Sequence, residues 1–213
     1  MLVVEKLSLS KKKKKILNQI SLEIGAGNLY LLLGKSGSGK TSLLRCISQL
    51  DADYEGTVTY QNQNLRELSP KKRTELIGFV SQIFSLFSHM TVLENCIHPL
   101  RTVLSYTREE ALVKTQAIFL SLDIVDISNS YPHEVSGGQM QRAAIARMLV
   151  MDPLFLFFDE PTSALDPENR NRFISIVQNL QKQGKGIFIS THDMELVESL
   201  SHTTFILDEG KLN

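Results

Sequence analysis

The segment GKSGSGKT, from Gly34 to Thr41, decides the fold class of this chain. It fits the pattern G-x-x-x-x-G-K-[ST] and directly follows the apolar run LYLLL at residues 29–33. The residues after it, SLLRCI at 42–47, are typical of the first turns of a helix. A strand, a glycine-rich turn and a helix N-terminus in this order are what a phosphate-binding loop requires. The segment therefore predicts an α/β phosphate-loop fold with a nucleotide site, and a glycine- and serine-rich surface loop is the alternative.

The residue types of this loop suit an anion. Its glycines let the backbone curl so that several N–H groups point into one concavity, at the positive end of the following helix. Lys40 is expected to reach the β- and γ-phosphates, and the Thr41 hydroxyl is expected to bind Mg²⁺. The residues predicted to contact the nucleotide are Gly34, Lys35, Ser36, Gly37, Ser38, Gly39, Lys40, Thr41 and Ser42.

The composition favours one compact domain with a substantial core. The 213 residues are 42% hydrophobic, and 23 basic residues balance 23 acidic ones. A net charge of zero argues against nucleic acid as the main partner, because no global field would attract it. The longest apolar runs, 29–33 and 154–158, are far too short to span a bilayer. We therefore expect a soluble chain that reaches a membrane only through a partner.

Strand and helix patterns alternate along most of the chain. Residues 2–7 and 16–24 predict two strands on either side of the lysine run 11–15. That run is expected to form a solvated hairpin turn, and a contact with anionic lipid is the alternative. A helix-rich stretch follows from about 91 to 150, and TREE at 107–110 predicts a capping box within it. Further strands are predicted at 57–60, 77–81, 154–158, 186–190 and 204–208.

Two acidic residues, Asp159 and Glu160, follow the all-apolar strand at 154–158. Ligands bind at the carboxyl ends of the strands in open α/β sheets, so this pair is placed at the expected site. An aspartate here is expected to hold Mg²⁺, and the longer Glu160 is expected to orient or deprotonate an attacking water. An acidic turn is the alternative, and the phosphate loop upstream argues against it.

A second glycine-rich helix N-terminus is predicted at SGGQ, residues 136–139. It offers a second anion site, and a flexible turn would explain the string equally well. Because one chain rarely wraps two such sites around one phosphate, we expect this one to serve the nucleotide of another subunit. Gln82 and His192 each follow a predicted strand, where their side chains are positioned to reach a γ-phosphate or its metal. For His192, a helix cap is the alternative.

Together these motifs resemble the ATP-binding subunits of ABC transporters over nearly the whole chain. GKSGSGKT is similar to their Walker A motif, and FVSQ, ending at Gln82, to their Q-loop. VSGGQMQR from Val135 is similar to the family signature, and LFLFFDEPTSALD from Leu154 to Walker B and the D-loop, with His192 as the switch histidine. The stretches IFSLFSHMTVLEN, YPHEVSGGQMQR and DEPTSALDPE most resemble importers of polar amino acids, although lipoprotein-releasing systems share much of this pattern.

The resemblance implies an ATPase that uses ATP and Mg²⁺ and works as a head-to-tail homodimer. It implies Glu160, His192 and Gln82 as catalytic residues, with Thr41, Gln82 and Asp159 at the metal. The partner's nucleotide would meet the signature residues Ser136, Gly137, Gly138 and Gln139.

The implied architecture is a single domain, 1–213, with an antiparallel β subdomain. Its nucleotide-binding core is expected in 1–90 and 151–213, and its helical subdomain in 91–150.

The resemblance also implies partners. A membrane-embedded permease is expected to dock on the segment 82–91, and a separate substrate-binding protein to deliver the solute. This would place the chain peripherally on the cytoplasmic face of the inner membrane, without nucleic acid. Three alternatives remain: a lipoprotein-releasing or other membrane-associated system, an ATPase of this family acting on DNA or the ribosome, and an ATP-dependent dimerisation switch with little turnover.

The chain departs from the family pattern at the base of the nucleotide. An aromatic residue that stacks on adenine is expected near Lys11, inside the lysine run, and none is present. Val135 also replaces the usual leucine at the head of the signature, and Thr41-Ser42 reverses the usual order of the two hydroxyl residues. The lysine predicts a weaker and less selective contact with the base.

Overall fold

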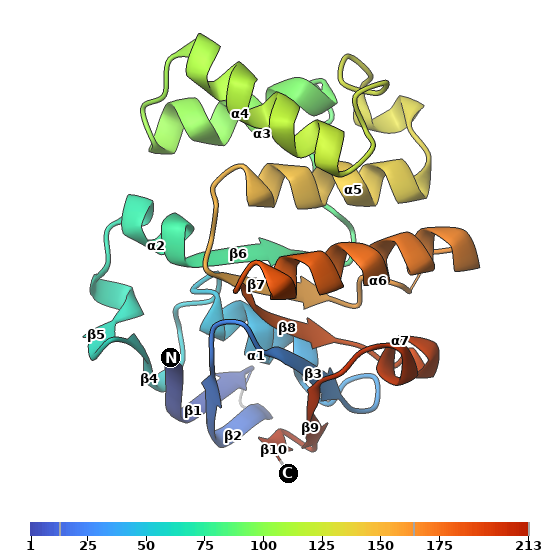
Figure 1. Cartoon of the computed structure of the whole chain (residues 1–213). Helices are drawn as coiled ribbons and strands as arrows, with labels where there is room; N and C mark the ends of the chain where they lie inside the picture. The colour runs from blue at the N-terminus through green and yellow to red at the C-terminus, as the bar shows by residue number, and fades with distance from the viewer. Residues whose placement is uncertain (13, 164, 213) are drawn as a thin grey trace.

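The computed structural model describes residues 1–12, 14–163 and 165–212, which form two β-sheets covered by helices (Figure 1). The strands are β1 (Leu2–Lys11), β2 (Lys14–Ile24), β3 (Leu29–Leu33), β4 (Glu55–Tyr60), β5 (Gln63–Asn64), β6 (Ile77–Val80), β7 (Phe155–Asp159), β8 (Gly186–Ser190), β9 (Thr203–Asp208) and β10 (Lys211–Leu212). The helices are α1 (Lys40–Ile47), α2 (Pro70–Leu76), α3 (Val92–Val103), α4 (Arg108–Ser121), α5 (Gly137–Leu149), α6 (Pro167–Lys182) and α7 (Met194–Ser199), with short 3₁₀ turns at Leu65–Glu67 and Pro132–Glu134.

The larger sheet has the order β10-β9-β3-β8-β7-β6. Strands β9, β3, β8, β7 and β6 are parallel, and β10 closes the edge as an antiparallel hairpin with β9. Strand β7 is buried along its whole length, as its apolar sequence predicts for a central parallel strand. Because β3, β6, β7 and β8 run in the same direction, the residues that follow them meet at one edge of the sheet.

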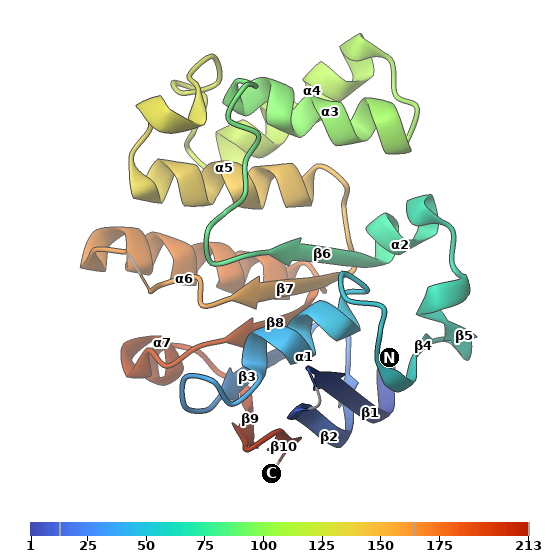
Figure 2. The same ribbon diagram turned by 180° about the vertical axis from the view of Figure 1, so that it is seen from behind.

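The smaller sheet is antiparallel, with the order β2-β1-β4-β5. Its hairpin is tighter than the sequence predicts, because Lys11 ends β1 and pairs with Lys14 at the start of β2. The predicted turn at 11–15 is therefore wrong in extent: most of the lysine run extends the two strands, and Lys13 lies outside the described residues. Helix α1 packs against both sheets and contacts β2, β7 and β8. Figure 2 shows the antiparallel sheet beneath α1.

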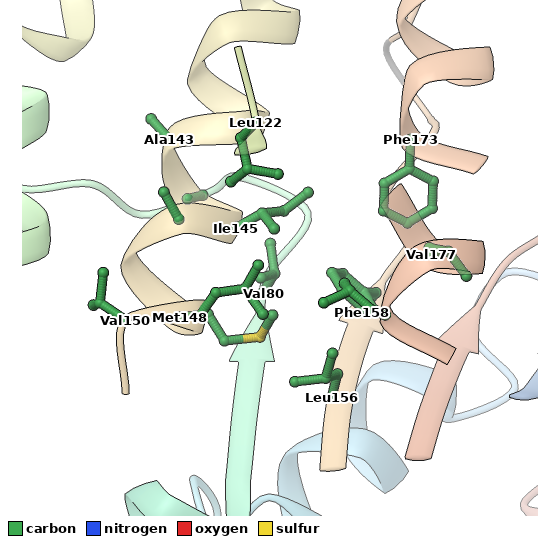
Figure 3. Close-up of a cluster of buried hydrophobic side chains, with 14 of the residues drawn as sticks. Val80, Leu122, Ala143, Ile145, Met148, Val150, Leu156, Phe158, Phe173 and Val177 are labelled. Carbon is green, nitrogen blue, oxygen red and sulfur yellow. The ribbon is translucent and has the colours of Figure 1, made fainter. Parts of the chain in front are cut away.

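The helical region covers the opposite face of the parallel sheet. Helix α5 packs there beside α6, and α3 and α4 lie over α5 (Figures 1 and 2). Figure 3 shows the buried cluster that joins these layers, with Ile145 and Met148 from α5, Phe158 from β7 and Phe173 from α6. Gly78 of β6 permits this close approach, because a Cβ there would lie 2.8 Å from the Met148 sulfur. The C-terminal half of α5 is thus held by a continuous core.

The capping box predicted at residues 107–110 is confirmed, because Thr107 caps α4 reciprocally with Glu110. Helix α6 begins with Asp166 as N-cap and Pro167 as first residue. The sequence analysis missed helix α2, although Ser69 and Pro70 provide the usual N-cap and first-turn signals. None of the described helices is long and apolar enough to cross a membrane.

Candidate nucleotide-binding site

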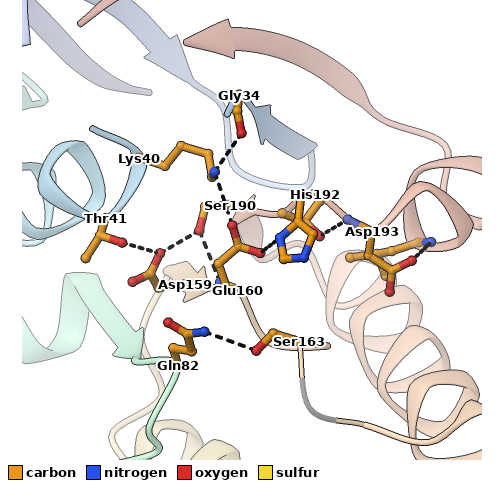
Figure 4. A network of polar contacts seen from close by, with 12 residues as sticks. Gly34, Lys40, Thr41, Gln82, Asp159, Glu160, Ser163, Ser190, His192 and Asp193 are labelled. Atoms are coloured by element: carbon orange, nitrogen blue, oxygen red, sulfur yellow. Dashed lines mark hydrogen bonds and ion pairs between the residues drawn. The ribbon is translucent and has the colours of Figure 1, made fainter. Parts of the chain in front are cut away.

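The residues that follow β3, β7 and β8 form one polar network at the edge of the parallel sheet (Figure 4). Thr41, in the first turn of α1, donates a hydrogen bond from Oγ1 to Asp159 Oδ1 at 3.1 Å. Ser190, at the end of β8, donates to the same oxygen at 2.6 Å. Asp159 is only 4% exposed, so these two hydroxyls fix its carboxylate in place.

Sequence reasoning missed Ser190. It lies directly opposite Asp159 in the parallel pairing of β7 with β8, and it is fully buried. A polar residue at the end of an otherwise apolar strand was the available signal. Its position beside Asp159, however, follows from the strand register, which the linear sequence does not display.

Lys40 lies at the centre of the phosphate loop. Its Nζ donates to the Gly34 carbonyl oxygen at 2.8 Å and lies 3.2 Å from Glu160 Oε1. The side chain is 8% exposed, and carbonyl and carboxylate oxygens compensate its charge. The loop therefore holds one buried cation beside the carboxylate that follows β7.

Glu160 is held from two sides. Its Oε2 lies 2.7 Å from His192 Nδ1, opposite the contact of Oε1 with Lys40. The Glu160 backbone has a φ of 47°, and its N–H donates to both the carbonyl and the hydroxyl oxygen of Ser190. A non-glycine residue in this left-handed conformation costs of order 1–3 kcal/mol and persists only where its surroundings enforce it. The turn after β7 is thus strained, and it aims the carboxylate between Lys40 and His192.

His192 does not cap α7. Asp193 is the N-cap of that helix, and its side chain accepts hydrogen bonds from the backbone of Glu195 and Leu196. This excludes the capping alternative for His192 and leaves its ring with Glu160.

Gln82 lies beside the segment that follows β7. Its Nε2 donates to Ser163 Oγ at 3.3 Å, so the amide faces a side chain four residues after Asp159. Of the three residues predicted at the metal, Thr41 and Asp159 are in direct contact, whereas Gln82 makes its contact with Ser163.

The donor set suits Mg²⁺. Among the described residues, no cluster of three or more His, Cys, Asp or Glu side chains is present that could hold a metal. Mg²⁺ commonly uses one or two protein oxygens and completes its octahedron with phosphate oxygens and water. The adjacent oxygens of Thr41 and Asp159 match that requirement, so these residues would hold the ion together with a bound nucleotide.

The second glycine-rich segment begins α5, as predicted. Ser136 is the N-cap, and Ser136 and Gln139 bond reciprocally in a capping box. In both views, α6 separates the N-terminus of α5 from the phosphate loop (Figures 1 and 2). The segment therefore does not complete the site of its own chain.

Lys11 does not extend freely toward the nucleotide. Its Nζ lies 3.1 Å from Asp51 Oδ2, and Arg45 hydrogen-bonds the other oxygen of the same carboxylate. The hydrogen bond from Arg45, supported by Lys11, holds the pKa of Asp51 below its ordinary value despite partial burial. Sequence reasoning missed this ion-paired cluster.

A parallel sheet whose strand ends gather a glycine loop, a buried lysine, Asp159 and Glu160 defines a phosphate-loop nucleotide-binding protein. The family model for the ABC transporter matches residues 17–163, and the chain belongs to this family.

Two curated relatives are similar over nearly the whole chain. The arginine transport ATP-binding protein ArtM of Bacillus subtilis (strain 168) is 38% identical, over 100% of this chain and 89% of that protein. The glutamine transport ATP-binding protein GlnQ of Escherichia coli (strain K12) is 38% identical, over 92% of this chain and 83% of that protein.

The fold is that of an ABC ATPase cassette. The dimeric structure of a post-hydrolysis state of the ATP-binding cassette MJ0796, bound to ADP and Pi, superposes with a TM-score of 0.88 at 29% identity. The match covers 100% of this chain and 97% of that one. These findings confirm the predicted family, the fold class and the activity class: the chain is an ABC transporter ATPase.

Proposed function

We propose that this chain hydrolyses MgATP as a homodimer and thereby powers a membrane importer of polar amino acids. The observation that carries the proposal is the placement of Glu160 between Lys40 and His192, directly beside the Thr41–Asp159 pair. This arrangement places three kinds of group next to one another. They are a cation for phosphate oxygens, two oxygen ligands for a metal, and a carboxylate that can bind the attacking water.

The contacts suggest how the residues act. Lys40 would exchange its contact with Glu160 for the β- and γ-phosphate oxygens, which frees one carboxylate oxygen of Glu160 to accept a hydrogen bond from the attacking water. His192 remains within reach of the other oxygen and orients the carboxylate. Mg²⁺ at Thr41 and Asp159 would neutralise charge on the phosphates.

Glu160→Gln tests the catalytic assignment. The amide preserves the size of the side chain but cannot act as a base, so we expect MgATP binding to persist while turnover falls by roughly 10²–10⁴-fold. Steady-state phosphate release and a nucleotide-binding titration measure the two quantities. Glu198→Gln, an exposed change on α7, is the matched control. Turnover within a few-fold of the natural protein would remove Glu160 from the catalytic role.

The same comparison addresses the dimerisation-switch alternative. If the natural protein turns over ATP no faster than Glu160→Gln, the chain acts by binding and closure rather than by hydrolysis. Rapid turnover that depends on Glu160 supports a motor.

The signature segment supports the homodimer. The MJ0796 cassette to which this chain is similar is described as dimeric, and the amides at the start of α5 lie away from the phosphate loop of their own chain. We therefore propose that Ser136, Gly137, Gly138 and Gln139 bind the nucleotide of the partner subunit.

Gly137→Asp tests this shared site. A Cβ at Gly137 meets nothing within 4 Å, so the new carboxylate would extend from the N-terminus of α5 toward the partner's phosphates without an internal clash. In the Glu160→Gln background, we expect unchanged ATP binding by the monomer and loss of the ATP-dependent dimer in size-exclusion chromatography. Gly137→Ala is the control. A dimer that forms equally well with the aspartate would contradict the shared site.

The surface after Gln82 supports a permease as partner. Arg147 of α5 donates to the carbonyl oxygens of Phe84 and Ser85. Asn95 of α3 accepts from the Phe87 backbone N–H and donates to the Phe87 carbonyl oxygen. Phe84 packs against the core, whereas Phe87 is 45% exposed. We propose that this fixed segment docks a permease, which holds the chain peripherally at the cytoplasmic face of the inner membrane.

The substrate class rests on the relatives. Proteins named for the transport of arginine, glutamine and L-cystine share 37–38% identity with this chain. The permease and a separate substrate-binding protein would select the solute. Co-purification of the native complex, followed by ATPase assays in vesicles with single amino acids, tests the proposal. A complex that no polar amino acid stimulates would contradict it.

A further inference from the structure

The side chain of Asn169 joins the N-terminus of α5 to the N-terminus of α6. The Asn169 carboxamide lies against Gly138 so closely that a Cβ at Gly138 would overlap it. Asn169 is not among the residues assigned to the nucleotide, the metal or the attacking water. Its position beside the signature segment nevertheless links that segment to a different part of the chain.

The carboxamide makes complementary hydrogen bonds on its two sides. Its Nδ2 donates to Asp166 Oδ2 at 2.7 Å, and Asp166 also accepts from the Asn169 backbone N–H at 2.9 Å. Its Oδ1 accepts from Arg142 Nη1 at 3.1 Å. Asn169 therefore joins the last residue of the DEPTSALD stretch to the helix that carries the signature.

Arg142 makes this contact costly to lose. Its residue is 7% exposed, and burial lowers the pKa of its guanidinium. Among the described residues, the Asn169 oxygen is the one acceptor within hydrogen-bond distance of the Arg142 side chain. Without Asn169, a buried cation would have to find a new partner or move.

A second contact joins the same two regions. Gln141 of α5, which is buried, donates from Nε2 to the Pro161 carbonyl oxygen at 2.8 Å. Pro161, next to the residue proposed to position water, is thus attached to α5 through Gln141, and Asp166 is attached to α5 through Asn169.

We propose that Asn169 is a positioning residue that holds the signature motif in the orientation that receives the partner's ATP. It does so by tying Gly138 and Arg142 to Asp166 of the same subunit. This inference rests on the homodimer of the proposed function.

Asn169→Ala in the Glu160→Gln background tests the inference, with Asn171→Ala as the matched control. Asn171 lies on the exposed side of the same helix, and its side chain makes no hydrogen bond among the described residues. We expect monomer ATP affinity to stay near that of the parent and the melting temperature to fall by only a few degrees, because Arg142 loses its acceptor. The protein concentration at half-maximal ATP-dependent dimerisation should rise about fivefold or more, because each dimer loses the contacts at two sites.

A purely structural role would not reproduce one further result. A methyl group at Gly138 would push the Asn169 side chain away, so Gly138→Ala should weaken dimerisation to a similar extent, and the double variant should show no additional loss. Asn169→Asp preserves the side-chain volume but sets a carboxylate against that of Asp166, so it should also weaken the dimer. It serves as the test variant if Asn169→Ala folds poorly.

The outcomes separate the two proposals. If the Glu160→Gln parent forms no ATP-dependent dimer, the homodimer fails and the inference fails with it. If the parent dimerises and Asn169→Ala matches Asn171→Ala, only the positioning role is overturned. Fully additive effects of Gly138→Ala and Asn169→Ala would also overturn it.

Discussion

Two glycine-rich helix N-termini in this chain are built differently: the phosphate loop before α1 and the signature segment before α5. In the phosphate loop, Gly39 precedes α1 with a φ of 107° and without any side-chain cap. In the signature segment, Ser136 precedes α5 in the ordinary extended conformation and closes a capping box with Gln139. The phosphate loop therefore needs glycine at position 39 for its backbone conformation, whereas many residue types can adopt the extended conformation that precedes α5.

In the signature segment, Gly138 is needed because there is no room for a side chain, not because of its backbone conformation. A Cβ at Gly138 would collide with Asn169, and one at Gly137 would extend into the open. The two segments also differ in charge. The phosphate loop holds the buried ammonium of Lys40, whereas the guanidinium of Arg142 near the signature points to Asn169. Within the described residues, the signature thus offers amides and a helix dipole but no cation free of other contacts.

This contrast explains why the two loops would bind a nucleotide under different conditions. A helix N-terminus alone contributes about 0.3–1 kcal/mol toward an anion at the surface, which is too little to retain a nucleotide. The phosphate loop adds a lysine and metal ligands and can bind alone. The signature segment suits a nucleotide that is already held by another subunit.

Lys40→Ala should break the comparison most severely, because it removes the cation that distinguishes the first loop. Hydrogen bonds to charged groups contribute about 1.5–3 kcal/mol, so we expect ATP affinity to fall by about a hundredfold. Isothermal titration with MgATP measures the loss. Lys71→Ala, an exposed change on α2, should stay within a few-fold of the natural protein. Micromolar affinity retained in Lys40→Ala would contradict the phosphate-loop assignment.

Gly34→Ala and Gly137→Ala sharpen the comparison as a matched pair. A Cβ at Gly34 would overlap the Leu207 carbonyl oxygen and lie 2.8 Å from Ser38 Oγ, whereas one at Gly137 meets nothing within 4 Å. We expect Gly34→Ala to lower the free energy of unfolding by roughly 1–3 kcal/mol, the cost of a locally strained backbone, and Gly137→Ala to be near neutral. Urea denaturation without nucleotide measures both. Equal stabilities would mean that the two loops tolerate a side chain alike.

The sequence predicted those parts of the site that local patterns encode. The GKSGSGKT turn, the apolar strand before Asp159 and the capping box at Thr107 each depend on neighbours along the chain, and the structure places all three as expected. Ser190 beside Asp159, Asn169 against Gly138 and Asp51 on Lys11 depend on strand register and on contacts across more than 30 residues. Such pairings are set by packing of whole elements, so no local pattern announced them.

Lys11→Tyr should have the smallest effect, and it tests what the phosphate loop lacks at the base. The β1–β2 hairpin lies against this loop, because a Cβ at Gly39 would be 3.0 Å from Leu17 Cδ2. Lys11 is 53% exposed on its side chain, so its ion pair with Asp51 contributes little, about 0–1 kcal/mol, and Arg45 would remain bound to that carboxylate. Base–aromatic stacking contributes about 1–3 kcal/mol, and after subtracting the lost ion pair we expect ATP to bind about fivefold more tightly.

Competition titrations with ATP and GTP measure this, and the natural protein should discriminate the two bases poorly. Lys15→Tyr, an exposed change on β2, controls for a general effect of tyrosine on the hairpin. Unchanged affinity in Lys11→Tyr, together with a clear preference for ATP in the natural protein, would mean that another residue supplies the platform for the base.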